Sequence, residues 1–293
     1  LESGMRAVVC PAFIDTNYEA FERETVRLVE RYAGADGGRL GVRIAPHAPY
    51  TCSPESVRKA LSLCEKYGLG IHVHLSETRS ETETIRQRYD KTSAEYLRDL
   101  GVFVYPTLAV HCVHLTEEDM DILFRYGVSV AYNPQSNMKL ASGVARIPEM
   151  LELGVPVGLA VDGSASNDGS SLLEELRAAF LLHRLTSSRR APTGYDVLKM
   201  ATRGSARLLG RDDIGQLAEG KCADLFMIDA RRLELVGCGC GVGDLLGTVG
   251  VRGPVDYTIV HGRVTVEGGR LTTVDEEQLA REAEAKCRAY LAM

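Results

Sequence analysis

Short apolar runs alternate with amphipathic stretches along most of the chain. Helical patterns begin between these runs at Ser53 before Pro54, at Thr92 with Glu95 three residues later, and at Thr116. This repetition of strand and helix patterns predicts βα units and a parallel sheet. The predicted buried strands are Arg6 to Cys10, Gly41 to Ala45, Gly70 to His74, Thr107 to His111, Val128 to Tyr132 and Val155 to Val161.

Polar side chains follow the predicted strands from the second strand onward. In a parallel βα barrel the carboxyl ends of all strands open on one face, so these residues converge there. A doubly wound sheet would instead gather them at a switch point in the strand order. Because each strand end from the second onward contributes, the pattern favours a barrel. The residues are His47, His74 with Glu77, His111 with His114, Asn133 with Asn137, and Asp162.

The sequence pattern changes after a helix predicted from about Tyr195 to Leu209. Glycine-punctuated segments from Gly215 to Asp229 and from Val255 to Leu271 are typical of short strands and turns. A charged amphipathic pattern from Glu276 to Leu291 predicts a helix that packs back on the surface. We therefore predict a barrel over residues 1–210, part of a small β domain over 211–275, and a C-terminal helix over 276–293.

Composition narrows the class of protein. With 45% apolar and 25% charged residues the chain is typical of a globular protein, and its net charge of -6 argues against a nucleic-acid partner. The one basic cluster, Arg189 and Arg190, reads as a solvated loop. No apolar run approaches the roughly 18 residues of a membrane span, so we expect no membrane association and a cytoplasmic location.

Cysteine spacing gives no sign of a metal cage or a disulfide framework. The eight cysteines include no C-x-x-C pair, and Cys238 and Cys240 have no histidines nearby. We expect free thiols, as in a cytosolic protein. The expected partners are a small molecule and further copies of the same chain in a homo-oligomer.

Histidines and carboxylates suggest a metal site at the barrel mouth. His72 and His74 lie on one face of a strand, since side chains two residues apart point the same way, and Glu77 follows the strand end. Strand histidines are as often hydrogen-bonded core residues as ligands. For Asp162 the alternative is a helix cap or Asx turn before a helix predicted from Ser170 to Leu185. Directly after an apolar barrel strand, however, an aspartate reads as catalytic.

Four segments together resemble the cyclic deaminase and chlorohydrolase branch of the amidohydrolase superfamily. They are residues 74–78 (HLSET), 109–115 (AVHCVHL), 133–143 (NPQSNMKLASG) and 161–167 (VDGSASN). Residues 215–225 (GQLAEGKCADL) and 260–263 (VHGR) resemble the return strands of the family's small β domain. The resemblance implies an α/β fold, here a partial (β/α)8 TIM barrel of strands 3 to 8 with part of a small β-sandwich domain.

The resemblance also implies roles for individual residues. The family holds one divalent metal, zinc or alternatively iron, between an H-x-H on the first strand, a histidine on the fifth and an aspartate on the eighth. By resemblance His74 and Asp162 are the last two ligands, whereas His72 matches none. Glu77 matches the acid that protonates the ring nitrogen, and His111 matches the histidine that orients the attacking water. Asp162 then takes the proton of that water.

The chain departs from the family at its beginning. Residues 1–6 resemble the turn before the third barrel strand, so the first two strands, with their H-x-H, are absent. A complete barrel takes about 250 residues. We therefore expect a fragment whose parent is the enzyme, while inactivity of this chain alone stays an alternative.

The substrate is predicted less sharply than the reaction. Residues 47–53 (HAPYTCS) resemble deaminases of S-adenosylhomocysteine and 5′-methylthioadenosine, whereas residues 161–168 and 209–215 resemble 8-oxoguanine deaminases. We predict release of ammonia from a purine base or nucleoside. The alternatives are a triazine hydrolase, a cyclic-amide hydrolase and a non-catalytic protein. The candidate substrate-binding residues are His47, which could instead hydrogen-bond loop backbone, and Asn133, Ser136 and Ser166.

Overall fold

The computed structural model describes residues 3–187, 190–237 and 241–292. Its parallel strands follow one another in chain order. β1 pairs with β3, β2 pairs with β4, and β5, β6, β7 and β8 form one sheet. Ile44 forms a bridge to Ile71 and accepts a hydrogen bond from the His72 amide, which joins the second run to the third. The bounds are β1 Ala7–Val9, β2 Ala12–Phe13, β3 Leu40–Val42, β4 Ala45–Pro46, β5 Ile71–Leu75, β6 Thr107–His111, β7 Ser129–Tyr132 and β8 Val157–Leu159.

All six predicted strands therefore occur, in parallel and in the predicted order. The first two are each divided into two short pieces, and the second piece of the first run, Ala12–Phe13, was not predicted. The α/β class is confirmed. Within the described ranges no pairing joins β1 to β8, so the partial barrel stays a prediction.

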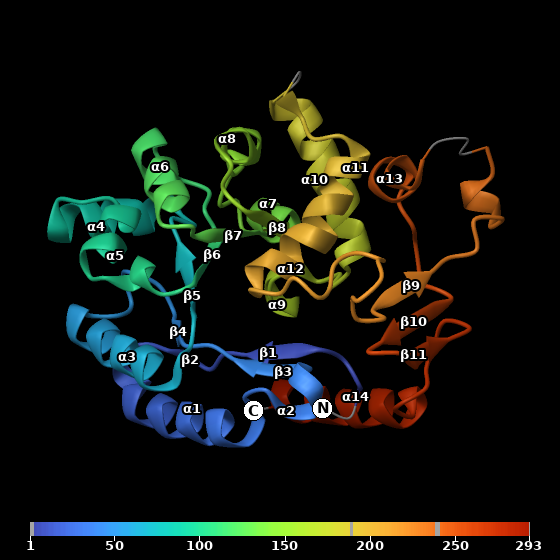
Figure 1. Ribbon diagram of the computed structural model, residues 1–293, viewed down its shortest axis with the longest axis horizontal. Helices are drawn as coiled ribbons and strands as arrows, with labels where there is room; N and C mark the ends of the chain where they lie inside the picture. Colours follow the sequence, from blue (N-terminus) through green and yellow to red (C-terminus); the bar gives the residue numbers. More distant parts are fainter. Residues whose placement is uncertain (1–2, 188–189, 238–240, 293) are drawn as a thin grey trace.

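Helices cover the outer side of these strands (Figure 1). Ser53, Thr92 and Thr116 each accept a hydrogen bond from a backbone amide three residues later, which confirms the predicted helix starts. The helix predicted from Tyr195 occurs as α11, a π-helix and α12 in succession. The helices are α1 Tyr18–Tyr32, α2 Ala35–Gly38, α3 Pro54–Tyr67, α4 Arg79–Tyr89, α5 Ser93–Asp99, α6 Glu117–Arg125, α7 Pro134–Lys139, α8 Ile147–Leu153, α9 Ser164–Asn167, α10 Leu172–Thr186, α11 Gly194–Lys199 and α12 Ser205–Leu208, with shorter helices at Asp15–Asn17, Val102–Val104 and Met200–Gly204.

Strands β6, β7 and β8 are buried on both faces, as their continuous apolar runs predict. On β5, Ile71, Val73 and Leu75 are at most 1% exposed and belong to the main core under the helices. His72 and His74 lie on the opposite face of that strand. A second, smaller core fills this inner side with Leu108, Val110, Ala131 and Leu208.

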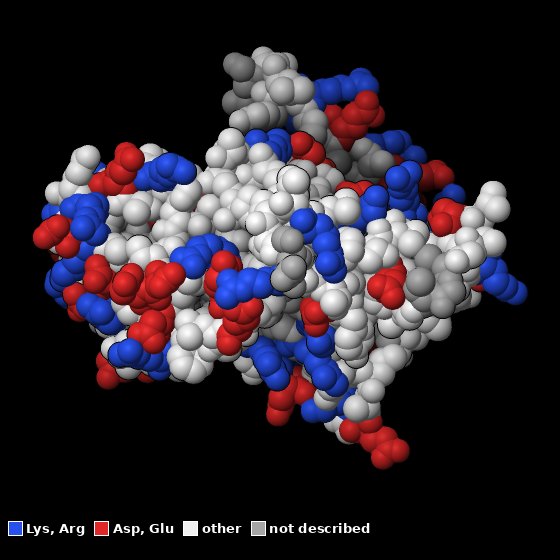
Figure 2. All heavy atoms as spheres, turned by 90° about the horizontal axis from the view of Figure 1, so that it is seen from above, with Lys and Arg blue, Asp and Glu red and all other residues white. Residues whose placement is uncertain are grey.

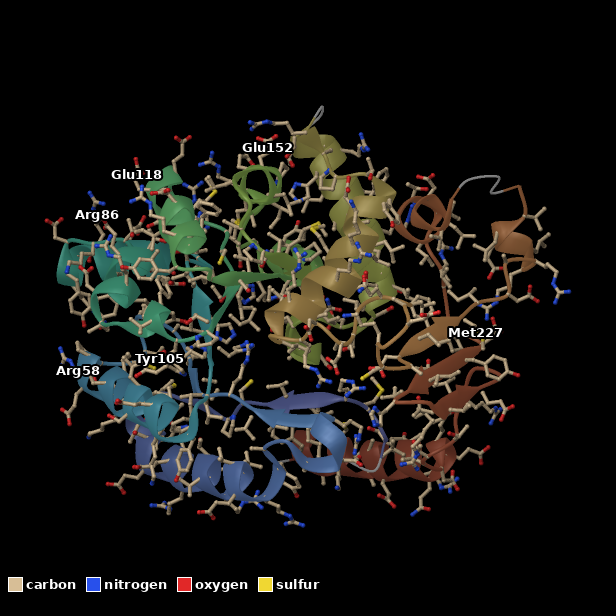
Figure 3. The ribbon with its side chains drawn as sticks, viewed as in Figure 1. Arg58, Arg86, Tyr105, Glu118, Glu152 and Met227 are labelled. Atoms are coloured by element: carbon tan, nitrogen blue, oxygen red, sulfur yellow. The ribbon has the colours of Figure 1, made fainter. Side chains whose placement is uncertain are left out.

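A four-stranded antiparallel sheet follows the parallel region and lies beside it, far from α4 and α5 (Figure 1). Met227, at its β9 edge, lies on the side opposite Arg58 and Arg86 in Figure 3. Arg6 donates two hydrogen bonds to Asp224 and so ties the start of β1 to this region. The elements are β9 Leu225–Met227, β10 Tyr257–Val260, β11 Arg263–Glu267, β12 Arg270–Leu271, α13 Val242–Asp244 and α14 Glu276–Leu291, with short helices at Leu233–Leu235 and Leu245–Val249.

Helix α14 occurs with the predicted bounds, but its expected packing is not seen. It buries none of its side chains, because every described position along it is exposed. The division into domains at residues 210 and 275 stays a prediction.

Surface charges and cysteines are described for most of the chain. Lys and Arg side chains are interspersed with Asp and Glu on the face seen in Figure 2. Arg190 pairs with Glu149 and Glu152, whereas Arg189 lies outside the described residues. No described helix is both long and apolar enough to cross a membrane. Cys238 and Cys240 also lie outside the described residues, and the free thiols are Cys10, Cys52, Cys64, Cys112, Cys222 and Cys287.

Candidate active site

Three turns at the carboxyl ends of the parallel strands adopt backbone conformations that are rare for residues other than glycine. Ser76 after β5 has a φ of +50°, His111 at the end of β6 has +70°, and Asp162 after β8 has +72°. Such conformations cost about 1–3 kcal/mol each and persist only where the surrounding contacts hold them. Because strained residues cluster at functional sites, this edge of the sheet is the candidate active site.

The strained turn at His111 changes the direction of its side chain. Leu108 and Val110 face the inner core, so strict alternation along β6 would send His111 outward to the helices. Instead its ring stacks on that of His74, with centroids 5.5 Å apart and an interplanar angle of 26°. The left-handed backbone of His111 therefore brings its imidazole to the inner side of the sheet.

Hydrogen bonds fix the tautomers of both histidines. Nδ1 of His74 lies 2.8 Å from the carbonyl oxygen of His47, which can only accept, so Nδ1 carries the proton. Nδ1 of His111 lies 2.8 Å from Oδ1 of Asn137 and donates to it in the same way. Burial lowers the pKa of His111, which favours the neutral ring. The neutral ring of His111 thus keeps an unprotonated Nε2.

Two carboxylates approach the free nitrogen of His111. Its Nε2 lies 3.7 Å from Oε2 of Glu77 and 4.0 Å from Oδ2 of Asp162. Ser136 donates a 2.5 Å hydrogen bond to the same oxygen of Asp162, and the Gly163 amide donates to the other at 2.7 Å. The Glu77 and Asp162 side chains are 22% and 20% exposed, so a small molecule can reach both.

The structure thus brings His74, Glu77, His111 and Asp162 together, with Ser136 beside them. The capping alternative for Asp162 is wrong, because Gly163 and Ser171 occupy the N-cap positions of α9 and α10. The roles of His74, Glu77, His111 and Asp162 in catalysis or metal binding stay predictions.

The other candidate residues differ in their distance from the cluster of His74, Glu77, His111 and Asp162. His47 stands next to His74, with ring centroids 4.9 Å apart, and its Nδ1 contacts the Thr51 hydroxyl at 2.9 Å, not backbone. Asn133 is 1% exposed, and its amide nitrogen lies 3.5 Å from Nδ1 of His111. Ser166 makes a backbone hydrogen bond to Gly163, and no side-chain bond links it to the cluster within the described part of the chain.

His72 shares the inner face of β5 with His74, with ring centroids 6.0 Å apart. Burial lowers its pKa to about 4, so its ring is neutral. Among the described residues no hydrogen bond to its side chain is found.

Sequence reasoning missed the residues that hold this cluster from behind. Asn137 was noted only as a polar residue after a strand, yet it fixes the tautomer of His111. Two buried glutamates had no assigned role. Glu81 accepts hydrogen bonds from the backbone amides of Ser76 and Glu77, and Glu175 does so from the amide of Gln135. The role of Glu81 could have been predicted, because it lies only four and five residues after the amides that it binds. The role of Glu175 could not, because its partner Gln135 is 40 positions away in the sequence.

The donors present are of the kinds that zinc takes in proteins. Neutral imidazole nitrogens and carboxylate oxygens are its usual ligands, and a ligating histidine typically donates its other ring proton to a carbonyl, as His74 does. The number of donors is incomplete, however. Among the described residues no group of three or more His, Cys, Asp or Glu side chains is placed to hold a metal ion.

Taken together, the parallel α/β region and its cluster of histidines and carboxylates define a hydrolase-like site at the carboxyl ends of the strands. The family model of the amidohydrolase family matches residues 1–265. The chain belongs to that family.

Two relatives are similar over nearly the whole chain. The 5-methylthioadenosine/S-adenosylhomocysteine deaminase of Pelotomaculum thermopropionicum is 42% identical over 97% of this chain, and that of Desulforudis audaxviator is 43% identical over 99%. The chain spans 66% and 68% of their respective lengths.

Solved structures with the same fold include two kinds of enzyme. An adenosine deaminase from Xanthomonas campestris with bound zinc matches with a TM-score of 0.92 and 26% identity, over 100% of this chain and 68% of that one. An atrazine chlorohydrolase from Arthrobacter aurescens in complex with zinc matches with a TM-score of 0.85 and 27% identity, over 92% and 60%.

Proposed function

We propose that the full-length protein containing this chain is a metal-dependent aminohydrolase that deaminates the adenine ring of 5′-methylthioadenosine or S-adenosylhomocysteine. The observation that carries the proposal is the convergence of Glu77, His111 and Asp162 within about 4 Å in a chain about 42% identical to relatives so named. Water replaces the exocyclic amine in this reaction, and ammonia leaves.

Zinc is the metal we propose, with iron as the alternative. His74 and Asp162 would hold it together with ligands from outside this chain, because the described residues provide too few. When bound, such an ion lowers the pKa of water towards 7 and makes it a nucleophile at neutral pH. The presence of zinc in two structures of the same fold supports this choice.

The chain's own residues supply the proton path. The unprotonated Nε2 of His111 accepts a hydrogen bond from the attacking water and so orients it. Asp162 accepts the proton of that water, and Ser136 holds the carboxylate in place. Glu77, which enters the step as the acid, donates its proton to the ring nitrogen beside the attacked carbon. It then relays the proton that Asp162 took from water to the departing amine, and it recovers its own proton from the hydroxyl group left on the attacked carbon.

Substrate contacts extend the proposal to the neighbouring polar residues. We propose that His47 and Asn133, which border the histidine pair, contact the purine. Ser166 is retained only as a contact of the outer rim. The partial barrel of strands 3 to 8, the division at residues 210 and 275, and assembly into a homo-oligomer are further parts of this proposal.

An ammonia-release assay on the full-length protein tests the substrate. The panel contains S-adenosylhomocysteine, 5′-methylthioadenosine, adenosine, guanine, 8-oxoguanine and a chlorinated triazine, with chloride measured in parallel. A site that matches the polar edge of its substrate rejects mismatched rings by orders of magnitude. We expect an adenosine derivative to stand well above the rest. Turnover of 8-oxoguanine alone would overturn the adenine assignment.

A triazine hydrolase is the second candidate, because the fold likeness to the chlorohydrolase is nearly as high as that to the adenosine deaminase. Fold and metal alone do not separate the two reactions. If the chlorinated triazine releases chloride and none of the purines releases ammonia, this candidate replaces the first.

A further inference from the structure

Glu175 is a fully buried carboxylate behind the candidate active site. It lies in the first turn of α10 and is 0% exposed. Oε2 accepts a hydrogen bond from the backbone amide of Gln135 at 3.1 Å, and Oε1 accepts one from the side-chain amide of Asn167 at 2.5 Å. Both oxygens are therefore engaged, each by a different segment of the chain.

The two segments that Glu175 joins carry the partners of the proposed catalytic groups. Gln135 lies at the start of α7, where backbone amides have no acceptor within the helix. The next residues of that helix, Ser136 and Asn137, bind Asp162 and His111. Asn167 ends α9, the short helix that follows Asp162 directly.

Glu175 thus links the turn after β7 to the turn after β8 from behind. Apart from Glu175, α7 reaches this turn through Ser136 and Asp162 at the site itself, where a strained backbone must be held. On the exposed side, Lys139 of α7 also donates a hydrogen bond to the Ala165 carbonyl of α9 and pairs with Asp168. An isolated buried carboxylate costs stability unless it is well hydrogen-bonded. Its presence here is explained by two converging donors that an apolar side chain would leave unsatisfied.

We propose that Glu175 is a positioning residue that sets the distance between Asp162 and His111 by holding α7 and α9 together. It does not touch the substrate or the reacting atoms in this arrangement. The inference deepens the proposed function, on which its catalytic readout rests.

The test exploits the pattern of donors and acceptors. In Glu175→Gln, the new amide group faces either the side-chain amide of Asn167 or the backbone amide of Gln135, so two donors oppose each other at one of the two contacts. Asn167 cannot turn over without penalty, because its Oδ1 accepts a hydrogen bond from the Ser170 amide. The double variant Glu175→Gln with Asn167→Asp restores a donor facing an acceptor at each contact and keeps the net charge. Glu174→Gln, at the exposed neighbouring position, is the matched control.

In the full-length protein we expect Glu175→Gln to lower kcat by about 10- to 100-fold, the usual scale for residues that orient a catalytic group, with KM changed less than about threefold. The double variant should recover at least about tenfold of that loss, and Glu174→Gln should match the wild type. If Glu175→Gln does not fold, Asn167→Ala, which frees only α9, should show the same loss in kcat. Wild-type kcat in Glu175→Gln, or in Asn167→Ala when it is the variant measured, overturns the proposal. So does a double variant no better than Glu175→Gln.

A second readout separates this inference from the proposed function. The rate of zinc loss to a chelator, measured on the same variants, does not depend on knowing the substrate. We expect about tenfold faster loss in Glu175→Gln and a return towards the wild-type rate in the double variant. If no substrate in the panel is turned over but this pattern appears, the positioning role stands and the proposed reaction fails. Equal rates in all variants overturn the positioning role.

Discussion

The turn after β5 and the turn after β8 have the same design but differ in how they are held. Each contains a residue with positive φ, Ser76 or Asp162, and each rests on a buried glutamate from a following helix. Glu81 reaches back only four and five residues, to the amides of Glu77 and Ser76. Glu175 instead joins segments 8 and 40 residues away. The glutamate behind the first turn acts within one βα unit, whereas the glutamate behind the second joins that turn to the neighbouring one.

This difference predicts how far damage spreads. A change behind the turn after β5 should affect Glu77 most, because Glu81 contacts that turn and the Ser93 hydroxyl of the adjacent helix. The turn is also joined to the segment after β6, since the Ser76 carbonyl accepts hydrogen bonds from the Val113 and His114 amides, but these bonds do not involve Glu81. A change behind the turn after β8 should affect Asp162 and, through α7, His111 as well. The following predictions test that contrast in the full-length protein.

The largest effect is expected at the proposed ligands themselves. His74→Ala and Asp162→Ala should each reduce bound metal strongly, and Asp162→Ala should lower turnover by about a thousandfold or more, because it also removes the proton acceptor. Elemental analysis of the purified variants and the ammonia assay measure the two effects. Unchanged metal content in both variants would exclude this ligand assignment.

Glu77→Gln should separate proton transfer from metal binding. The amide keeps the size of the side chain but cannot donate a proton as an acid, so turnover should fall by at least about a hundredfold, the common scale for a positioned acid or base. Metal content and thermal stability should stay at wild-type values, since Glu77 is not among the proposed ligands. Wild-type turnover in Glu77→Gln would mean that this residue only shapes the turn.

The same contrast explains what could be foreseen from the sequence. Strands, helix caps and polar strand ends depend on neighbours a few residues apart, so the six strands and the caps at Ser53, Thr92 and Thr116 were predicted. Candidate site residues such as Glu77 and Asp162 stand directly after apolar strands, where the signal is local. Their convergence within about 4 Å of His111 followed from the parallel fold.

Features that depend on distant partners were not predicted. The inward turn of His111 contradicts strict alternation and arises from its left-handed backbone. The link from Glu175 to Gln135 crosses 40 residues, and no periodic pattern encodes it. The exposure of α14 was also not predicted. An amphipathic pattern predicts a helix, but it does not show which surface of the protein would cover its apolar side.

Glu81→Gln should have a smaller effect than Glu77→Gln. One oxygen still accepts a hydrogen bond, but the new amide group opposes a backbone amide of Ser76 or Glu77, which loosens the turn. We expect about a tenfold loss of kcat, within the range for residues that orient a catalytic group. Glu83→Gln, at an exposed position on the same helix, is the control.

Metal retention decides whether this effect stays local. If Glu81→Gln releases zinc to a chelator as fast as Glu175→Gln does, the two buried glutamates act equally on the metal site, and the contrast between the two turns is wrong. A kcat loss with wild-type zinc retention supports it.

The smallest effect concerns stability and pH. Burial raises the pKa of Glu175 to about 7 from an ordinary value of 4.5, with Glu174 and Asp162 as nearby negative charges. Tyr132, whose ring packs on that of His183, is also close enough to feel the charge of Glu175. The folded protein therefore binds more protons than the unfolded chain between these pH values. Its stability should fall as pH rises from about 4.5 to about 7 and change little from this group above that, by at most on the order of 3 kcal/mol. Denaturant unfolding at pH 5, 6 and 8 should show this slope in the wild type but not in Glu175→Gln. Parallel stability curves for the two proteins would show that Glu175 ionises normally and that burial is offset by its two hydrogen bonds.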